Sequence, residues 1–127
     1  MAVLDSSFLI DVLRNRHGAV RLLAELEQRE SLFVPSLAVM GLWEGVLRGR
    51  FPATERRRVE ELFAAASILD FDARAAKRAA ELAVELTHLP LEPEDVMIAA
   101  IALVRGEKLV TRDAHYARVP GLVVVKY

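Results

Sequence analysis

The sequence of 127 residues contains no cysteine, which excludes disulfide bonds, thiolate metal sites and thiol catalysis. A chain without disulfides suits a reducing compartment. No apolar run approaches the roughly 18 residues that a membrane span needs. The first residues, Met1 to Asp5, also lack the basic start of a signal peptide. We therefore expect a cytoplasmic protein with no membrane partner.

An excess of positive charge is missing as well. Seventeen basic and 18 acidic residues give a net charge of -1, so no global field attracts nucleic acid. A polyanionic partner would have to bind a local basic patch. Aromatic residues make up only 6% of the chain, which is too few for a platform on which bases stack.

The composition that is present belongs to a globular protein. Hydrophobic residues make up 54% of the chain and charged residues 28%, far from the composition of disordered segments. The length is that of one domain, because domains cluster at roughly 100–150 residues. Residues 1–127 are therefore expected to form a single domain.

Short apolar runs alternate with segments of helical periodicity along the chain. The expected strands are residues 2–4, 32–35, 68–69, 108–111 and 122–125. The expected helices follow Asp5 through Leu13, then cover 19–29, 36–49 with Ser36 as its cap, 53–63, 73–87 and 95–104, with a loop at Pro90 and Pro93. This alternation predicts an α/β fold with three layers, α/β/α, around a mainly parallel sheet of about five short strands.

Four acidic residues occupy positions that favour a common site. Asp5 and Asp113 each follow an expected strand, and ligands collect beyond the carboxyl ends of parallel strands. Asp95 opens an apolar helix, and Glu44 interrupts an apolar helical stripe. Each acid taken alone also has a structural explanation: a cap, a helix-dipole contact, a turn or an Arg salt bridge. Their convergence is what favours a site.

Four carboxylates in one place would repel one another and raise each other's proton affinity until a cation binds. Oxygen ligands suit Mg²⁺ or Mn²⁺, which lower the pKa of a water nucleophile and stabilise charge on a phosphodiester. The pattern therefore indicates metal-assisted hydrolysis.

The same positions lie in segments that resemble a known family. The segments are Val3–Asp11, Glu44, Asp95–Ala100, Leu109–Asp113 and Val119–Leu122. In this order and spacing they resemble the PIN-domain nucleases, and within them the VapC-type toxins. Two departures are Tyr116, where many relatives have Phe, and the acidic approach to Asp95. Neither removes one of the four acids.

The resemblance implies a set of site residues. It implies Asp5, Glu44, Asp95 and Asp113 as the catalytic acids, with Mg²⁺ or Mn²⁺ held by Asp5, Asp95 and Asp113, the first two most directly. Thr111 and Ser6 would orient acids or water through hydrogen bonds. It further implies cleavage of single-stranded or looped RNA to a 5′-phosphate and a 3′-hydroxyl, inhibition by a cognate antitoxin protein, and a homodimer.

Basic side chains give a weaker signal. Five arginines cluster near the end of the expected helix that carries Glu44: Arg48, Arg50, Arg56, Arg57 and Arg58. Arg48, Arg50 and Arg112 are candidates for contact with RNA phosphates, with a solvated charged surface as the alternative. The histidines lack metal-ligand spacing, although His115 lies near Asp113.

Two other classes of protein remain open. A receiver-type signalling domain also binds Mg²⁺ with acids at strand ends, but Asp5 is followed by two serines rather than a second acid. Asp70 and Asp72 follow a middle strand, yet no late strand ends in a suitable Lys. A catalytically silent PIN-like module that only binds protein would be expected to lack one of the four acids, and all four are present.

Overall fold

The computed structural model describes residues 1–89 and 91–127. The strands are β1 (Ala2–Leu4), β2 (Leu32–Pro35), β3 (Ser67–Leu69), β4 (Lys108–Val110) and β5 (Val124–Val125). The helices are α1 (Ser6–Leu13), α2 (His17–Arg29), α3 (Ser36–Leu47), α4 (Ala53–Ala65), α5 (Ala73–Glu85), α6 (Pro93–Arg105) and the 3-10 helix η1 (Ala114–Arg118).

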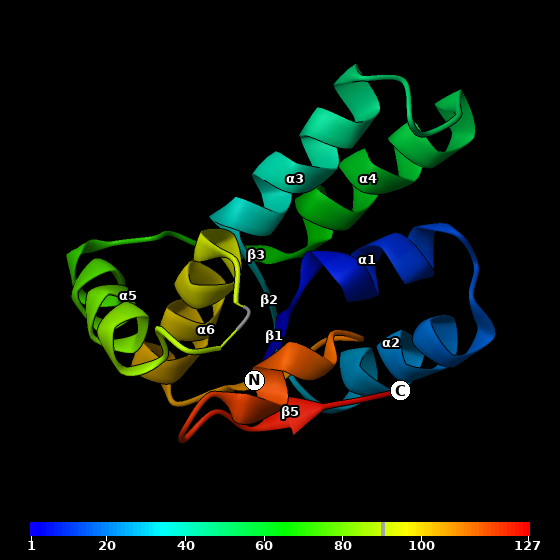
Figure 1. Cartoon of the computed structure of the whole chain (residues 1–127). Helices are drawn as coiled ribbons and strands as arrows, with labels where there is room; N and C mark the ends of the chain where they lie inside the picture. The colour runs from blue at the N-terminus through cyan, green and yellow to red at the C-terminus, as the bar shows by residue number, and fades with distance from the viewer. Residues whose placement is uncertain (90) are drawn as a thin grey trace.

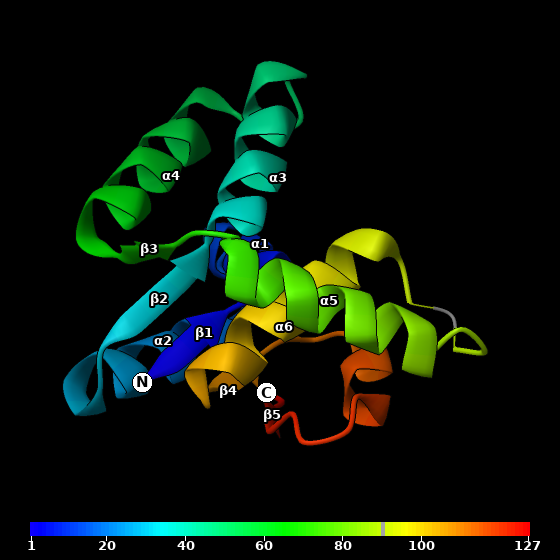
Figure 2. The ribbon, with the colours of Figure 1, turned by 90° about the vertical axis from the view of Figure 1, so that its left-hand side faces the viewer.

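The five strands form one sheet in the order β3-β2-β1-β4-β5, and every neighbouring pair is parallel. Figure 2 shows the strands following one another in this order. Strands β2 and β3 lie on one side of β1, and the later strands β4 and β5 lie on its other side. The order therefore reverses between β1 and β4, which is where open α/β sheets form a crevice for ligands.

Alternating side chains of the short strands supply two cores. Val3 and Leu109 point into a core with α5 and α6, whereas Leu4 and Val110 point into a core with α1, α2, α3 and α4. Figure 1 shows α5 and α6 on one side of the strands and α1 and α2 on the other. The predicted three-layer α/β/α fold with five parallel strands is confirmed.

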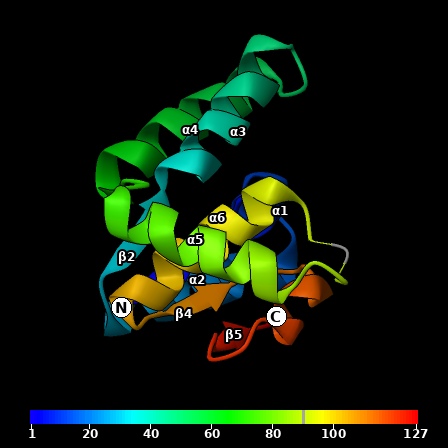
Figure 3. The ribbon, with the colours of Figure 1, turned by 60° about the vertical axis from the view of Figure 1, so that its left-hand side comes forward.

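Helices α3 and α4 form a hairpin that projects away from the sheet (Figures 1 and 3). Gly45 permits close packing at its tip, because a Cβ there would lie 2.6 Å from Cε2 of Phe51. On α3, Met40 and Leu47 are 55% and 76% exposed. The face of α3 that carries Met40, Glu44 and Leu47 is therefore mostly exposed to solvent, although its apolar pattern is typical of a buried helix face.

Several boundaries differ from those predicted. Ser36 is the first residue of α3 rather than its cap, because Pro35 occupies the N-cap position without a side-chain hydrogen bond. Helix α5 ends at Glu85 and β5 covers only Val124–Val125. The expected loop residue Pro90 lies outside the described residues. Among the helices described, none has the length and apolar character to cross a membrane.

Candidate active site

Asp5 is fixed at the end of β1 by two hydroxyl groups. Its side chain is only 4% exposed, and its Oδ2 accepts hydrogen bonds from Thr111 Oγ1 at 2.7 Å and Ser7 Oγ at 2.9 Å. Asp5 occupies the N-cap position of α1, yet its side chain makes no capping hydrogen bond. The capping explanation therefore fails, and the carboxylate is held by the residue that follows the neighbouring strand β4.

Asp95 lies in the first turn of α6, where the helix begins at Pro93. Its Oδ1 accepts a hydrogen bond from the hydroxyl of Tyr116 at 3.1 Å, and Tyr116 is fully buried. The hydroxyl that distinguishes Tyr116 from Phe thus contacts an acid of the site. This contact is specific to the tyrosine, since a phenylalanine would leave Asp95 without that donor.

Asp113 follows β4 and begins η1, where its Oδ1 accepts a hydrogen bond from His115 N at 2.8 Å. The ring Nδ1 of His115 lies 3.2 Å from the same oxygen. Thr111 Oγ1 accepts a hydrogen bond from Asp113 N at 3.0 Å. One buried threonine therefore ties the carboxylate of Asp5 to the backbone of Asp113, as expected for a residue that orients the acids.

Burial and mutual repulsion act on the acids together. Burial raises the pKa of the Asp5 carboxyl above its usual range, and the charge of Asp113 raises it further. The hydrogen bonds from the Thr111 and Ser7 hydroxyls lower this pKa, but not enough to cancel the rise. Burial also raises the pKa of Asp95, and the charges of Asp113 and Asp5 add to this effect. The structure therefore brings Asp5, Asp95 and Asp113 within electrostatic reach of one another.

Glu44 sits at the margin of this group. Its side chain is 50% exposed and its Oε1 accepts a hydrogen bond from Arg48 Nε at 3.0 Å, four residues further along α3. The buried environment expected for Glu44 was wrong, because the outer face of α3 is open to solvent. The Arg salt bridge weighed for this residue is present.

Glu94 is an acid of the site that the sequence did not single out. Burial is the largest cause that raises the pKa of the Glu94 carboxyl, and the charges of Asp95, Asp5 and Glu44 raise it further. It also faces α3, since a Cβ built on Gly41 would lie 4.0 Å from its Oε1. The acidic approach to Asp95 was the available signal. Glu94 thus lies within electrostatic reach of Glu44 and of the two aspartates.

Two predicted site residues, Ser6 and Arg112, differ in their observed contacts from what their predicted roles require. The hydroxyl that contacts both Asp5 and Thr111 belongs to Ser7, not Ser6, because the second residue of a helix can reach back to the N-cap position. Among the described residues, Ser6 makes no side-chain hydrogen bond in this site. Arg112 donates from Nη1 to Asp11 Oδ1 at 2.8 Å, so its guanidinium is already engaged within the chain.

The donor set suits a hard divalent cation. Asp5 and Asp95 form no salt bridge with any basic side chain in residues 1–89 and 91–127, although burying a carboxylate without a counter-charge is costly. Within that part of the chain, no three Asp, Glu or His side chains stand in a preformed ligand arrangement. The oxygen donors nevertheless fit Mg²⁺ or Mn²⁺ by charge and chemistry.

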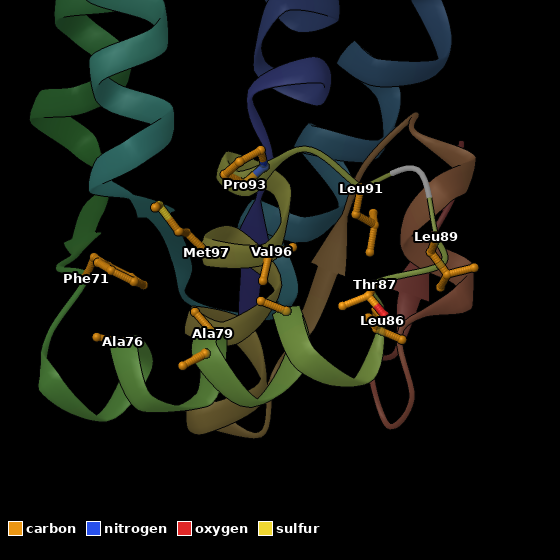
Figure 4. Close-up of a pocket in the computed structure, with 12 residues that line it drawn as sticks. Phe71, Ala76, Ala79, Leu86, Thr87, Leu89, Leu91, Pro93, Val96 and Met97 are labelled. Carbon is orange, nitrogen blue, oxygen red and sulfur yellow. The ribbon is translucent and has the colours of Figure 1, made fainter.

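An apolar groove of about 410 Å³ lies beside this acidic group but does not contain it. Figure 4 shows Pro93, Val96 and Met97 of α6 on one wall and Ala79 of α5 on another. The acids instead gather where α6 begins, beyond the ends of β1 and β4. This apolar groove is thus separate from the acidic group.

Comparison with known proteins places these features in a family. The model of the PIN domain matches residues 2–122. A VapC of Shigella flexneri, called a tRNA(fMet)-specific endonuclease, is 30% identical over 123 residues, covering 94% of this chain and 92% of that protein.

Solved structures agree with this match. The complex VapBC2 of Rickettsia felis, bound to a promoter DNA fragment, superposes with a TM-score of 0.89 at 20% identity, covering 99% of this chain and 98% of that chain. DNA-bound VapBC of Salmonella typhimurium gives 0.86 at 26% identity, covering 98% and 96%.

The fold and the acidic group define a nuclease of the α/β class, and the chain belongs to the PIN domain family. Within this family it is similar to VapC of Shigella flexneri over nearly the whole length of both chains. The receiver-type and silent-module alternatives are not favoured.

Proposed function

We propose that this protein is a metal-dependent endoribonuclease that uses Asp5, Asp95 and Asp113 to hold Mg²⁺ or Mn²⁺. The observation that carries the proposal is a pair of carboxylates, the buried Asp5 and the half-buried Asp95, that form no salt bridge in the described chain. They lie where the strand order reverses between β1 and β4, which is the usual place for a ligand in such a sheet.

The residues of the chain prepare this site for hydrolysis. Thr111 and Ser7 hold Oδ2 of Asp5, and Tyr116 holds Oδ1 of Asp95, so both carboxylates are oriented before substrate binds. When bound, the cation supplies positive charge that lowers the pKa of a water and offsets charge on the phosphodiester. Glu44 and Glu94 add negative charge at the edge that faces α3.

RNA and an antitoxin protein are the partners that this function requires. A relative of 30% identity is a tRNA-specific endonuclease by name, which supports RNA as the substrate class. Structural neighbours that include a toxin–antitoxin complex of Klebsiella pneumoniae and a member of the VapBC family of toxin–antitoxin systems support a cognate antitoxin. We further propose that the toxin acts as a homodimer in the cytoplasm, where its RNA substrates are found.

The direct test is incubation of the purified protein with tRNA and with total RNA, in Mn²⁺, in Mg²⁺ and in chelator. We expect cleavage products with a 5′-phosphate in either metal and none in chelator. Undiminished cleavage in chelator would overturn the metal site. Absence of cleavage of both RNA preparations at millimolar metal would overturn the ribonuclease assignment.

We expect Mg²⁺ or Mn²⁺ to raise the melting temperature of the protein. A ligand that binds only the native state stabilises it by about 2.7 kcal/mol at about 100 times its Kd. Thermal unfolding at neutral pH, with and without each metal, measures the shift. The Asp5→Asn variant is the control and should shift much less. An equal shift in that variant would show that the metal binds elsewhere.

Arginines near the tip of the α3–α4 hairpin are suited to bind RNA phosphates. Residues 48–58 contain five arginines and one glutamate, whereas the whole chain carries a net charge of -1. Arg50 is exposed, and Arg48 is 62% exposed beside Glu44. This is the local positive patch that a near-neutral nuclease needs to hold a polyanion next to an acidic site.

We expect the double substitution Arg48→Gln and Arg50→Gln to raise KM for RNA severalfold while changing kcat less. Each phosphate contact to a single strand contributes about 0.7 to the slope of log affinity against log salt, so the slope should become shallower. Arg105→Gln is the matched control, because Arg105 is exposed at the opposite end of α6 from Asp95. An unchanged slope in the double variant would contradict this assignment.

A further inference from the structure

A second buried acid, Asp11, lies outside the acidic group. It is 1% exposed on α1, accepts hydrogen bonds from two side chains and forms a salt bridge with a third. Arg112 Nη1 lies 2.8 Å and Arg16 Nε 3.1 Å from its Oδ1, and the Tyr127 hydroxyl lies 2.5 Å from Oδ2. The Tyr127 ring also packs edge-on against Phe8, with 5.0 Å between ring centroids.

Asp11 differs from Asp5 in how its charge is balanced. Two guanidinium groups and a phenol surround Asp11, whereas two hydroxyl groups donate to the side chain of Asp5, which forms no salt bridge in the described chain. A buried carboxylate with two cations has no need of a metal. Asp11 lies on α1 and binds Arg112, which follows β4, so this contact ties those two elements together.

This tie reaches the acidic group through Arg112, which is held at both ends. Its guanidinium binds Asp11, and its backbone N donates to Ser7 Oγ at 3.1 Å. Ser7 Oγ in turn donates to Oδ2 of Asp5. The neighbours of Arg112 on either side are Thr111, which also donates to Asp5, and Asp113.

We propose that Asp11 and Arg112 form a positioning pair that aligns the end of β4 with the first turn of α1 and so sets Asp5 and Asp113 for hydrolysis. The inference rests on the proposed nuclease function of the acidic group. It assigns Arg112 to internal alignment rather than to RNA contact, because its guanidinium compensates a buried charge, whereas Arg48 pairs with the half-exposed Glu44.

The test compares Asp11→Asn, Arg112→Gln and their double variant with wild type. Loss of groups that orient the acids of a metal site typically costs 10–100-fold in activity or metal affinity. We expect kcat to fall about 10–100-fold in each single variant, with KM changed less than about threefold. Because the two residues act as a unit, the double variant should lose no more than either single one.

Arg16→Gln is the matched control. Arg16 forms a salt bridge with the same oxygen of Asp11, but it contacts no residue of the acidic group. It should lower the melting temperature while leaving kcat near that of wild type. Arg112→Lys guards against a failure to fold, since it keeps a positive charge for Asp11 but loses the fork geometry, and it should show an intermediate kcat.

Amide hydrogen exchange of the metal-free protein gives a readout that needs no activity. The backbone N–H groups of Arg112 and Asp113 donate to Ser7 and Thr111, so their exchange should accelerate at least about tenfold in Asp11→Asn and not in Arg16→Gln. If the wild-type protein does not cleave RNA, the proposed nuclease function fails, but this measurement still tests whether Asp11 and Arg112 align the end of β4.

Three results would overturn the pair. One is unchanged exchange at Arg112 and Asp113 in Asp11→Asn. A second is a kcat within threefold of wild type in both single variants of an active enzyme. The third is an Arg112→Gln variant whose KM rises with a shallower salt dependence and whose effect adds to that of Asp11→Asn, since that pattern marks a phosphate contact.

Discussion

RNA cleavage is expected to fall at least about 10³-fold in Asp5→Asn, the size of loss seen when a central group of a catalytic unit is removed. The amide keeps one oxygen that can accept hydrogen bonds from Thr111 and Ser7, so the local packing is preserved. It lacks the negative charge that holds a divalent cation. A gel assay with tRNA, at saturating Mn²⁺, measures the loss, and Ser6→Ala serves as a control on an adjacent residue.

The same variant should be more stable than wild type when no metal is present. Burial raises the native pKa of Asp5 above the ordinary value of 3.8, so the native state binds this proton more tightly than the unfolded state. Ionised Asp5 therefore destabilises the fold at neutral pH. As pH falls through the raised pKa the penalty is relieved, and below the ordinary value both states are protonated and the difference vanishes.

Melting curves of both proteins in chelator, from neutral pH to below pH 3.8, test this sign. We expect a higher melting temperature for Asp5→Asn at pH 7, converging with wild type in acid. The comparison isolates Asp5, because other titrating groups are common to both proteins. A less stable variant at pH 7 would show that the hydroxyls compensate the buried charge fully and that the site does not need a cation.

The placement of Asp5 and Asp113 at the ends of strands could be predicted from the sequence, because strand ends follow from local patterns. The apolar runs before Asp5 and before Thr111 end where charged residues begin, and parallel strands bring such ends to one edge. Gly106 marked the end of α6 in the same local way, with its positive φ of 66°. Five strands in three layers followed from this alternation.

The surroundings of the acids were harder to predict, because they depend on which face of an element is covered. The stripe of Met40, Glu44 and Leu47 has the period of a buried helix face, yet nothing in the described chain packs over it. The choice between Ser6 and Ser7 depends on one residue of helical rotation. The partners of Asp11 lie more than 100 residues away in the case of Arg112 and Tyr127, so no local pattern reports them.

Adjacent acids on α6 offer the sharpest division of roles within the site. Successive residues of a helix point about 100° apart, so Asp95 and Glu94 cannot serve as equivalent ligands. The Tyr116 hydroxyl anchors Asp95, whereas Glu94 is exposed and faces α3 near Gly41. The anchored acid is therefore the better candidate for a metal ligand.

We expect Asp95→Asn to reduce kcat by at least about 10³-fold and to remove most of the metal-dependent thermal shift, because an anchored negative ligand is lost. Glu94→Gln should cost less than about tenfold in kcat and keep that shift. It should also stabilise the metal-free protein, since it relieves repulsion with Asp95, Asp5 and Glu44. Single-turnover kinetics and melting curves of the two variants side by side measure both effects.

The reverse ranking would be equally informative about geometry. If Glu94→Gln lost both activity and the metal-dependent shift while Asp95→Asn kept them, the cation would bind on the side of the acidic group that faces α3, next to Glu44. The Tyr116 hydrogen bond would then serve the packing of η1 against α6 rather than the chemistry. Tyr116→Phe separates these cases, because it should lower kcat only if Asp95 is the ligand that the hydroxyl orients.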